Sequence, residues 1–156
     1  AKLTAALEAA HARKVLHRDI KPQNIMVDRR REPYLMDFGV ARVLGGPGLT
    51  SSGIFLGTPN YASPEQAGLR TLDGRSDLYA LGVVLFEMAV GRRPFLGDTS
   101  QEVLTQHKEV APPDPRSLHP ALSDDLADVI LRCLAKDPAQ RYPDATALGQ
   151  ALRQLR

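Results

Sequence analysis

One segment limits the possible folds of this chain more than any other, and it spans residues 76–90. The segment is apolar on nearly every face of a helix, and the helix-ending residues Gly91 and Pro94 follow it. A helix without a polar face has to be covered by other elements on all sides. The sequence therefore predicts a buried central helix with Ser76 as its N-cap and its end near Val90. The apolar run is shorter than the roughly 20 residues that span a bilayer, which favours a core helix.

The segments around this helix have the patterns of further secondary structure. Two short apolar runs, residues 25–27 and 34–36, flank a charged turn and are predicted to pair as a β-hairpin. Residues 37–66 are expected to be mostly irregular, and residues 111–120, with four prolines, are expected to be an extended connector. The chain should thus form a mainly α domain with one small hairpin. Other helices are predicted over residues 1–13, 99–110, 123–134 and 144–155.

Composition and charge restrict the possible partners. A chain of 156 residues is long enough for one domain with its own core, and a net charge of +2 is too small to indicate a nucleic-acid partner. The densest basic cluster, residues 29–31, is interpreted as a solvated turn, with an anion patch as the alternative. The single cysteine, Cys133, excludes an internal disulfide, and its place on an apolar helix face predicts a buried thiol.

Three short strings carry the chemical information of the sequence. They read His-Arg-Asp-Ile-Lys-Pro-Gln-Asn at residues 17–24, Met-Asp-Phe-Gly at 36–39 and Gly-Thr-Pro-Asn-Tyr-Ala-Ser-Pro-Glu at 57–65. Each string alone is a weak signal, but all three in this order, with the hairpin between the first two, are specific. Together they resemble the catalytic-loop, metal-loop and activation-segment signatures of the protein kinase family. The sequences at residues 63–66 and 76–82 are most similar to those of bacterial Ser/Thr kinases.

The resemblance covers essentially the whole chain and implies the large C-terminal lobe of a protein kinase. It implies ATP and Mg²⁺ as cofactors, and proteins with Ser or Thr hydroxyls as substrates. No Gly-rich strand-loop and no nucleotide-binding lysine precede the first string, so the N-terminal β lobe is expected to be absent. Residues 1–156 are therefore expected to be a partial kinase domain that needs this missing lobe as a partner. The chain by itself is expected to bind ATP weakly and to transfer phosphate negligibly.

For catalysis, the resemblance assigns roles to four residues. Asp19 is expected to accept a hydrogen bond from the substrate hydroxyl and to orient it, since alignment matters more here than basicity. Lys21 lies two residues further on, on the same side of an extended loop, where it can stabilise the transferring phosphate. A lysine at this position is typical of Ser/Thr kinases. Asn24 completes the loop, and Thr58 is expected to face it and help define the substrate.

Two of the strings supply oxygen ligands for a metal. Asn24 and Asp37 offer the hard oxygen atoms that Mg²⁺ prefers, and the resemblance implies that both bind it. Together with Lys21 they are also expected to contact the nucleotide. Phe38 is expected to pack so that Asp37 is held inward, and Gly39 permits the backbone to swing.

Regulatory roles follow from the same resemblance. Arg18 is expected to bind a phosphate on the activation segment and so to order it. The candidate phosphorylation sites lie in a Gly-rich stretch, where simple solvation of a loop is the alternative explanation for hydroxyl-bearing residues. These candidates are Thr50, Ser51 and Ser52.

Three further residues are expected to hold the domain together. Glu65 is predicted to form a structural ion pair with Arg141. Asp77, near the start of the central helix, is predicted to accept hydrogen bonds from the backbone of the catalytic loop. An acidic residue at a helix N-terminus is also favourable by itself, because it opposes the helix dipole.

Two other classes of function stay open at this point. One is a pseudokinase or scaffold that binds partners without chemistry, which the presence of Asp19, Asn24 and Asp37 opposes. The other is a small-molecule phosphotransferase of kinase-like fold, which the string at residues 57–65 opposes. The intact protein is therefore predicted to be a Ser/Thr protein kinase. We expect it in the cytoplasm, or on the cytoplasmic face of a membrane through a segment that lies outside this chain.

Overall fold

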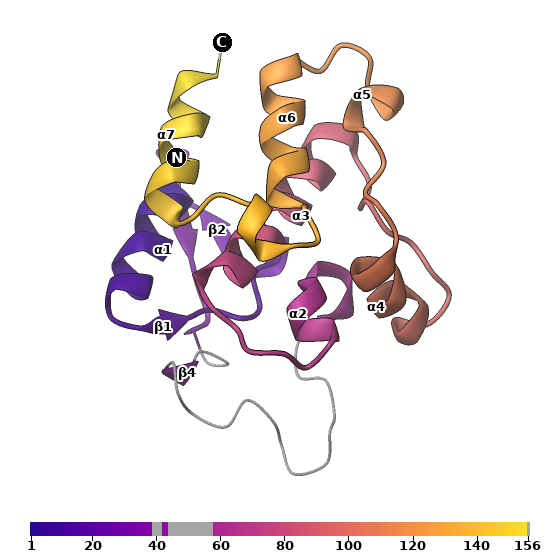
Figure 1. The fold of residues 1–156 in the computed structure, drawn as a ribbon. Coiled ribbons are helices and arrows are strands. Elements are labelled where there is room, and N and C mark those ends of the chain that lie inside the picture. The colour runs from indigo at the N-terminus through magenta and orange to yellow at the C-terminus, as the bar shows by residue number, and fades with distance from the viewer. Residues whose placement is uncertain (39–41, 44–57, 156) are drawn as a thin grey trace.

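The computed structural model describes residues 1–38, 42–43 and 58–155, which form a mainly α domain with two short β-ribbons (Figure 1). This confirms the predicted fold class. The described elements, in chain order, are α1 (Lys2–Ala12), β1 (Val15–Leu16), the 3₁₀ turn η1 (Pro22–Asn24), β2 (Ile25–Val27), β3 (Pro33–Leu35), β4 (Arg42–Val43), the 3₁₀ turn η3 (Pro59–Tyr61), α2 (Pro64–Ala67), α3 (Gly74–Val90), α4 (Ser100–Glu109), α5 (Pro115–Leu118), α6 (Asp124–Cys133), the 3₁₀ turn η4 (Pro138–Gln140) and α7 (Ala145–Gln154).

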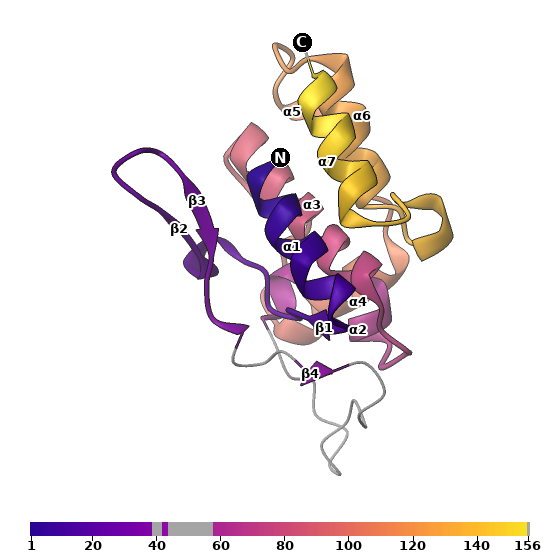
Figure 2. The same ribbon diagram turned by 90° about the vertical axis from the view of Figure 1, so that its left-hand side faces the viewer.

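Helix α3 is the centre of the hydrophobic core, as its apolar sequence predicts. Its side chains Leu78 and Val83 are fully buried, and helices α1, α6 and α7 pack around it (Figures 1 and 2). On the α6 side, the Cys133 thiol is completely buried, and this burial raises its pKa to about 12. The thiol is therefore an inert part of the core, as the sequence predicts.

The start of α3 differs from the prediction. The N-cap is Asp73, whose carboxylate accepts a hydrogen bond from the Arg75 N–H, so the helix begins at Gly74. The prediction of Ser76 as the N-cap is wrong, because the Ser76 hydroxyl donates instead to Glu65 Oε1 at 2.8 Å. Either side chain has the chemistry of an N-cap, and the tertiary partner of Ser76 decides between them.

The other end of α3 matches the prediction. The helix stops at Gly91, which adopts φ +77°, a conformation that glycine enters without a steric penalty. The chain therefore turns sharply after Val90 and runs through Arg93 into the buried residues Pro94 and Phe95. Among the described residues, no helix is both long enough and apolar enough to cross a membrane.

The two ribbons lie at one edge of the helices. Strands β2 and β3 pair antiparallel with Ile25 opposite Leu35, and Figure 2 shows this hairpin extending away from the helices. The hairpin is confirmed, with β3 shifted by one residue from the predicted 34–36. Directly beyond the last pair, the Met36 N–H donates to the Asn24 carbonyl at 2.8 Å. Strands β1 and β4 form the second ribbon, with Val15 opposite Val43.

Two segments expected to be irregular contain short helices in their described parts. The connector at residues 111–120 includes α5, where Asp114 caps the turn and Pro115 occupies its first position, so a wholly extended connector is wrong. The stretch at residues 37–66 ends in η3 and α2. Helix α2 has a capping box in which Ser63 and Gln66 each bind the other's backbone N–H. Proline, which fixes a helix-compatible φ, begins each of these turns.

Candidate functional site

The loop between β1 and β2 carries most of the candidate catalytic residues, and a buried carboxylate on α3 fixes its first part. Asp77 is 1% exposed, and its two oxygens accept hydrogen bonds from the His17 N–H at 3.0 Å and the Arg18 N–H at 2.9 Å. The His11 ring nitrogen Nε2, from α1, lies 2.7 Å from Asp77 Oδ2. The position predicted for Asp77 from the sequence agrees with these contacts. The loop is thus tied to the central helix.

Arg18 turns the loop through a conformation that non-glycine residues rarely adopt. Its φ is +68°, in the left-handed region. The Arg18 N–H is bound by Asp77, and the Arg18 carbonyl accepts a hydrogen bond from Gln66 Nε2 on α2 at 2.8 Å. Backbone strain of this kind persists where the surroundings fix both sides of the peptide, and it is common at functional sites.

The strained turn presents Asp19 to three side chains that the sequence groups with it. Thr58 Oγ1 donates to Asp19 Oδ1 at 2.9 Å, and Lys21 Nζ lies 2.6 Å from Asp19 Oδ2. Lys21 Nζ also donates to Thr58 Oγ1 at 2.8 Å, and Asn24 Nδ2 donates to the Asp19 carbonyl at 2.7 Å. The four candidate catalytic residues therefore form one hydrogen-bonded cluster.

The surroundings of Asp19 keep its side chain ionised. Burial by itself raises the pKa of this carboxyl, but the hydrogen bonds from Lys21 and Thr58 outweigh it, so the pKa lies below its ordinary value. A carboxylate of this kind is a weak base and a strong hydrogen-bond acceptor. It is suited to orienting a hydroxyl rather than to removing its proton early.

Asp37 lies on a segment that is bound to the catalytic loop on both sides of Met36. The Met36 N–H donates to the Asn24 carbonyl, and the Met36 carbonyl lies 2.9 Å from His17 Nε2. Asp37 itself has φ +62° and an exposed side chain. The Phe38 ring packs edge-on against the His17 ring, with 4.6 Å between centroids. Asp37 is thus placed next to the loop that carries Asp19 and Asn24.

The donor atoms of Asn24 and Asp37 fit a magnesium site. The Asn24 amide nitrogen is used by Asp19, which leaves the amide oxygen as its ligand atom, and Asp37 offers an exposed carboxylate. Mg²⁺ commonly takes one or two protein oxygens and completes its shell with water and phosphate. Within the described ranges, no group of three or more His, Cys, Asp or Glu side chains is placed to hold a metal.

An open pocket of about 620 Å³ lies beside the cluster, and we call it the loop pocket. Three of the candidate catalytic residues line it, namely Lys21, Asn24 and Thr58. The other charged or hydroxyl-bearing lining residues were not predicted from the sequence, and they are Tyr61, Glu87 and Arg93. Tyr61 lies in the third string and was within reach of motif reasoning. Glu87 and Arg93 come to the pocket only because the end of α3 packs near η3.

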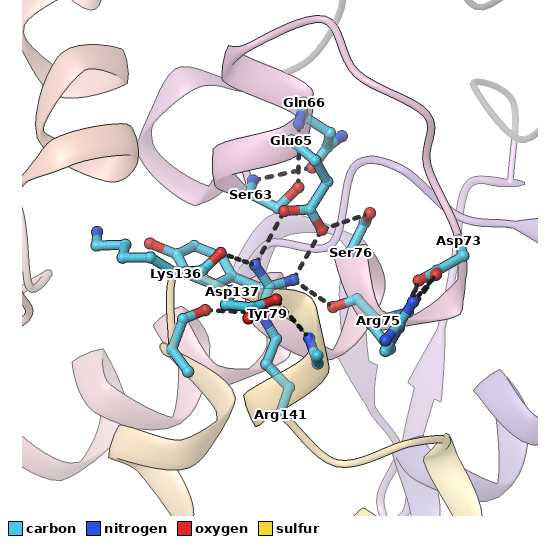
Figure 3. A network of polar contacts seen from close by, with 12 residues as sticks. Ser63, Glu65, Gln66, Asp73, Arg75, Ser76, Tyr79, Lys136, Asp137 and Arg141 are labelled. Carbon is cyan, nitrogen blue, oxygen red and sulfur yellow. Dashed lines mark hydrogen bonds and ion pairs between the residues drawn. The ribbon is translucent and has the colours of Figure 1, made fainter.

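A buried ion pair supports the segment that follows Thr58 (Figure 3). The two guanidinium nitrogens Nη1 and Nη2 of Arg141 lie 2.7 and 2.9 Å from the two carboxylate oxygens of Glu65. The other N–H groups of Arg141 donate to the carbonyls of Arg75, Ala135 and Lys136. All five donors of the guanidinium are thus satisfied, which a buried arginine requires.

The Glu65 carboxylate is ionised for the same reason. Burial raises its pKa, but the hydrogen bonds and charge of Arg141 outweigh this effect, so its pKa lies below the usual value. The Ser76 hydroxyl adds a third hydrogen bond. The ion pair that the sequence predicts between these two residues is present in the structure.

A buried histidine, which the sequence analysis did not identify, supports the same segment from α4. His107 is fully buried, with Nε2 3.2 Å from the Asn60 carbonyl and Nδ1 2.9 Å from the Tyr79 hydroxyl. A carbonyl oxygen can only accept, so Nε2 carries the proton and Nδ1 accepts from Tyr79. Burial is the main reason that the pKa of His107 falls to about 4, and the ring is therefore neutral. A single histidine in an amphipathic helix gives no sequence signal for this role.

The expected regulatory contacts cannot be placed in the same way. Thr50, Ser51, Ser52 and Gly39 lie outside the described residues. The role of Arg18 as the ligand of a phosphate on the activation segment therefore stays a prediction.

The fold and these contacts together define a class of protein. It has a buried central helix that anchors the loop of Asp19 through a strained turn at Arg18, beside a second loop that carries Asp37. Residues 1–152 match the protein kinase domain, and the chain belongs to this family.

The chain is also similar to curated bacterial proteins. It is 45% identical over 153 residues to serine/threonine-protein kinase Pkn1 of Myxococcus xanthus. The matched segment covers 95% of this chain and 22% of Pkn1. It is 47% identical over 145 residues to the DNA damage-responsive serine/threonine-protein kinase RqkA of Deinococcus radiodurans, covering 92% and 22% of the two chains. The identity to serine/threonine-protein kinase PknB of Mycolicibacterium smegmatis is 41% over 145 residues, covering 92% and 23%.

These matches confirm the predicted resemblance to bacterial Ser/Thr kinases. The chain spans less than a quarter of the length of each of these three relatives.

Proposed function

We propose that the intact protein transfers the γ-phosphate of ATP to Ser or Thr hydroxyls of other proteins. The observation that carries this proposal is the cluster of Asp19, Lys21 and Thr58 at the loop pocket. Phosphoryl transfer needs positioned reactants and compensation of negative charge more than it needs covalent chemistry from the protein. A carboxylate and an ammonium group held 2.6 Å apart provide both at one point.

The proposed roles follow from the charges and hydrogen bonds of the cluster. The substrate hydroxyl would donate to an oxygen of Asp19, taking the place of the Thr58 hydroxyl or of Lys21. Lys21 would then turn its ammonium group toward the phosphate oxygens, where negative charge develops. Asn24 holds Asp19 in place through the backbone carbonyl, so the direction of the carboxylate does not depend on Lys21 alone.

We further propose ATP and Mg²⁺ as the cofactors, with Asn24 and Asp37 as metal ligands and Lys21 in contact with the nucleotide. When bound there, the metal ion would neutralise phosphate charge. The support is the chemistry of the two oxygen donors and the backbone hydrogen bond that joins their loops. Since ATP is a cytoplasmic metabolite, we place the site in the cytoplasm or at the cytoplasmic face of a membrane.

The hairpin face is the surface where we propose that a second, N-terminal lobe packs. Several large apolar side chains on and just after β2 and β3 are exposed to solvent in this chain, and exposed apolar patches often mark interaction surfaces. They are Met26, Val27, Tyr34, Met36 and Phe38. The same face is continuous with the loop of Asp37, so a lobe seated there would also cover a nucleotide. The domain is then two-lobed, and residues 1–156 form one of its lobes.

The test is a phosphotransfer assay on the full-length protein with ATP, Mg²⁺ and a mixture of Ser- and Thr-containing proteins. We expect Asp19→Asn to lower the rate by roughly 10²–10⁴-fold, the usual contribution of a positioned acid–base group. The matched control is Asp125→Asn, because Asp125 has an exposed carboxylate at the start of α6. This variant should keep the transfer rate of the unaltered protein. Equal rates for Asp19→Asn and the unaltered protein would contradict the proposal. So would a full-length protein that labels no Ser or Thr.

A further inference from the structure

The charged side chains of the loop pocket differ in whether they already have a polar partner within the protein. Lys21 is paired with Asp19 at 2.6 Å. Glu87 accepts a hydrogen bond from the Tyr61 hydroxyl at 2.7 Å, which holds its carboxylate toward η3. Burial, and then this contact with Glu87, raise the pKa of Tyr61, so the phenol stays protonated and remains a donor. Both Lys21 and Glu87 therefore have their strongest polar contact within the protein.

Arg93 is different. Within residues 1–38 and 58–155, its guanidinium forms no hydrogen bond or ion pair, although the residue is only partly exposed and lines the pocket. It is also held in place from both sides, because Gly91 forces the turn after α3 and Phe95, 2% exposed, anchors the chain beyond it. Five N–H donors are thus presented to a pocket whose other charged groups have partners.

We propose that Arg93 binds an acidic side chain of the protein substrate and so selects Ser or Thr acceptors that have Asp or Glu close by. This inference rests on the proposed function of the site. A guanidinium binds a carboxylate through two parallel hydrogen bonds, a geometry that a lysine or an amide does not provide. Since Arg93 and the Asp19 partners Lys21 and Thr58 line one pocket, the acidic residue lies within a few positions of the acceptor hydroxyl.

Glu87 lines the same pocket, and its carboxylate would favour a basic residue in the substrate instead. Two observations favour Arg93 as the recognising group. The Glu87 carboxylate already accepts the Tyr61 hydroxyl, whereas the donors of Arg93 have no such contact in the described part of the chain. Among the described residues Glu87 and Arg93 also form no ion pair with each other, although both line the pocket. A substrate carboxylate bound at Arg93 would gain a direct partner.

The experiment uses the full-length protein with ATP and Mg²⁺ and sets of Ser peptides that differ only by Glu, Gln or Lys at one position near the acceptor. We expect kcat/KM to favour the Glu peptide about tenfold at one position, the effect of one charge-assisted contact. Arg93→Gln should bring this ratio close to one, and Arg93→Glu should reverse it in favour of a Lys peptide. A loss of general folding would lower both rates together and would not reverse the ratio.

Arg92→Gln is the matched control, because Arg92 is the adjacent, exposed arginine and does not line the pocket. It should keep the Glu-to-Gln ratio of the unaltered protein. The inference is overturned when the unaltered protein shows no preference at any position, when it prefers Lys peptides, or when Arg93→Gln keeps the preference.

A binding measurement separates this inference from the proposed function. Peptides with Ala in place of the acceptor Ser require no phosphate transfer, so their affinity reports recognition alone. Tighter binding of the Glu form, lost in Arg93→Gln, supports the inference even when no transfer is detected. Transfer without any effect of charge overturns the inference and leaves the kinase assignment standing.

Discussion

Arg141 and Glu65 lie 76 residues apart in the sequence and face each other as a buried, two-point ion pair (Figure 3). Glu65 is in α2, directly after the segment with Thr58, and Arg141 follows η4 near the end of the chain. The pair therefore fastens the loop-pocket segment to the C-terminal part of the core. Since Arg141 also binds the Arg75 carbonyl at the start of α3, its guanidinium joins α2 and the start of α3 to the segment after η4.

Removal of this guanidinium is expected to destabilise the domain strongly. Arg141→Met would leave the Glu65 carboxylate buried without a counter-charge, which typically costs about 3–5 kcal/mol of unfolding free energy. Urea unfolding followed by circular dichroism measures the change. Arg116→Met is the matched control, because Arg116 has three carboxylates nearby but lies at the surface, where ion pairs contribute little. Similar losses of stability for the two variants would contradict the argument.

A second prediction concerns Asp77, which joins α3 to the catalytic loop. In Asp77→Asn, one carboxylate oxygen becomes an NH₂ group that faces a backbone N–H of His17 or Arg18, so one hydrogen bond becomes a repulsion. Hydrogen bonds to a charged group are typically worth about 1.5–3 kcal/mol, and the strained turn at Arg18 depends on them. We expect kcat of the full-length protein to fall by about tenfold or more, because Asp19 is then less well oriented.

The control for this variant is on the same helix. Asp73→Asn replaces the N-cap of α3 by another good N-cap residue, so it should change stability only slightly and leave kcat as it is. An Asp77→Asn protein with normal kcat would show that the loop holds its conformation without the carboxylate.

How far the sequence predicts the structure depends on where the partner of each residue lies. Asp19, Lys21 and Asn24 share one short loop, and the two-residue spacing of Asp19 and Lys21 places these two on one side of it. That Thr58 faces this loop was predicted only from the resemblance to protein kinases. The error at Ser76 has a tertiary origin, since its hydroxyl is taken by Glu65 and the N-cap moves to Asp73. A local sequence pattern does not show that Glu65 competes with the helix N-terminus for the Ser76 hydroxyl.

The residues that the sequence analysis missed share the same property. Glu87, Arg93 and His107 come from the end of α3, from the turn after it and from α4, and they act on η3 or the loop pocket only through packing. The periodicity of a helix identifies which face is buried, but it does not identify the element that covers that face. A charged residue at the end of an apolar helix therefore has no visible partner until the fold is known.

A third prediction follows from the burial of His107. Its pKa in the folded protein is about 4, against 6.5 for an ordinary histidine, so the unfolded chain binds a proton between these pH values and the folded chain does not. The neutral ring's contribution to stability is complete above about pH 6.5 and is lost as the pH falls through 4. The difference corresponds to about 3 kcal/mol. Glu65 acts in the same direction at lower pH, because its pKa is also depressed in the folded state.

The pH dependence of unfolding in urea separates these contributions. His107→Gln should be less stable at neutral pH, and its unfolding free energy should fall less steeply between pH 6.5 and 4 than that of the unaltered chain. His119→Gln, at an exposed position, controls for the loss of any one histidine. Parallel pH curves for the unaltered chain and His107→Gln would show that His107 does not set the slope.

The last prediction concerns the contact between α3 and α6. A Cβ atom added at Gly82 would lie 2.5 Å from Cys133 Cβ, closer than two such atoms can approach. Alanine in place of glycine stabilises a helix by about 1 kcal/mol, but overpacking of this kind costs about 1–3 kcal/mol. The overpacking term should win, because a Cβ atom is fixed to its backbone and cannot rotate away, so the two helices would have to separate. Gly82→Ala is therefore expected to lower the unfolding free energy by up to about 2 kcal/mol.

A double-mutant cycle with Cys133 tests the cause of that loss. Cys133→Gly removes the Cβ atom that collides, so Gly82→Ala should cost less in its presence, with a coupling of about 1 kcal/mol. Cys133→Ala keeps the Cβ atom and removes only the thiol, so the full cost of Gly82→Ala should remain. Equal costs in the Cys133→Gly and Cys133→Ala backgrounds would mean that the clash lies elsewhere, for instance with Leu134, whose Cδ2 is 3.4 Å from the added atom. The Cys133→Gly and Cys133→Ala backgrounds differ only in the Cβ atom of residue 133. A smaller cost of Gly82→Ala in the glycine background, with the full cost in the alanine background, therefore identifies the contact between the two Cβ atoms as the cause.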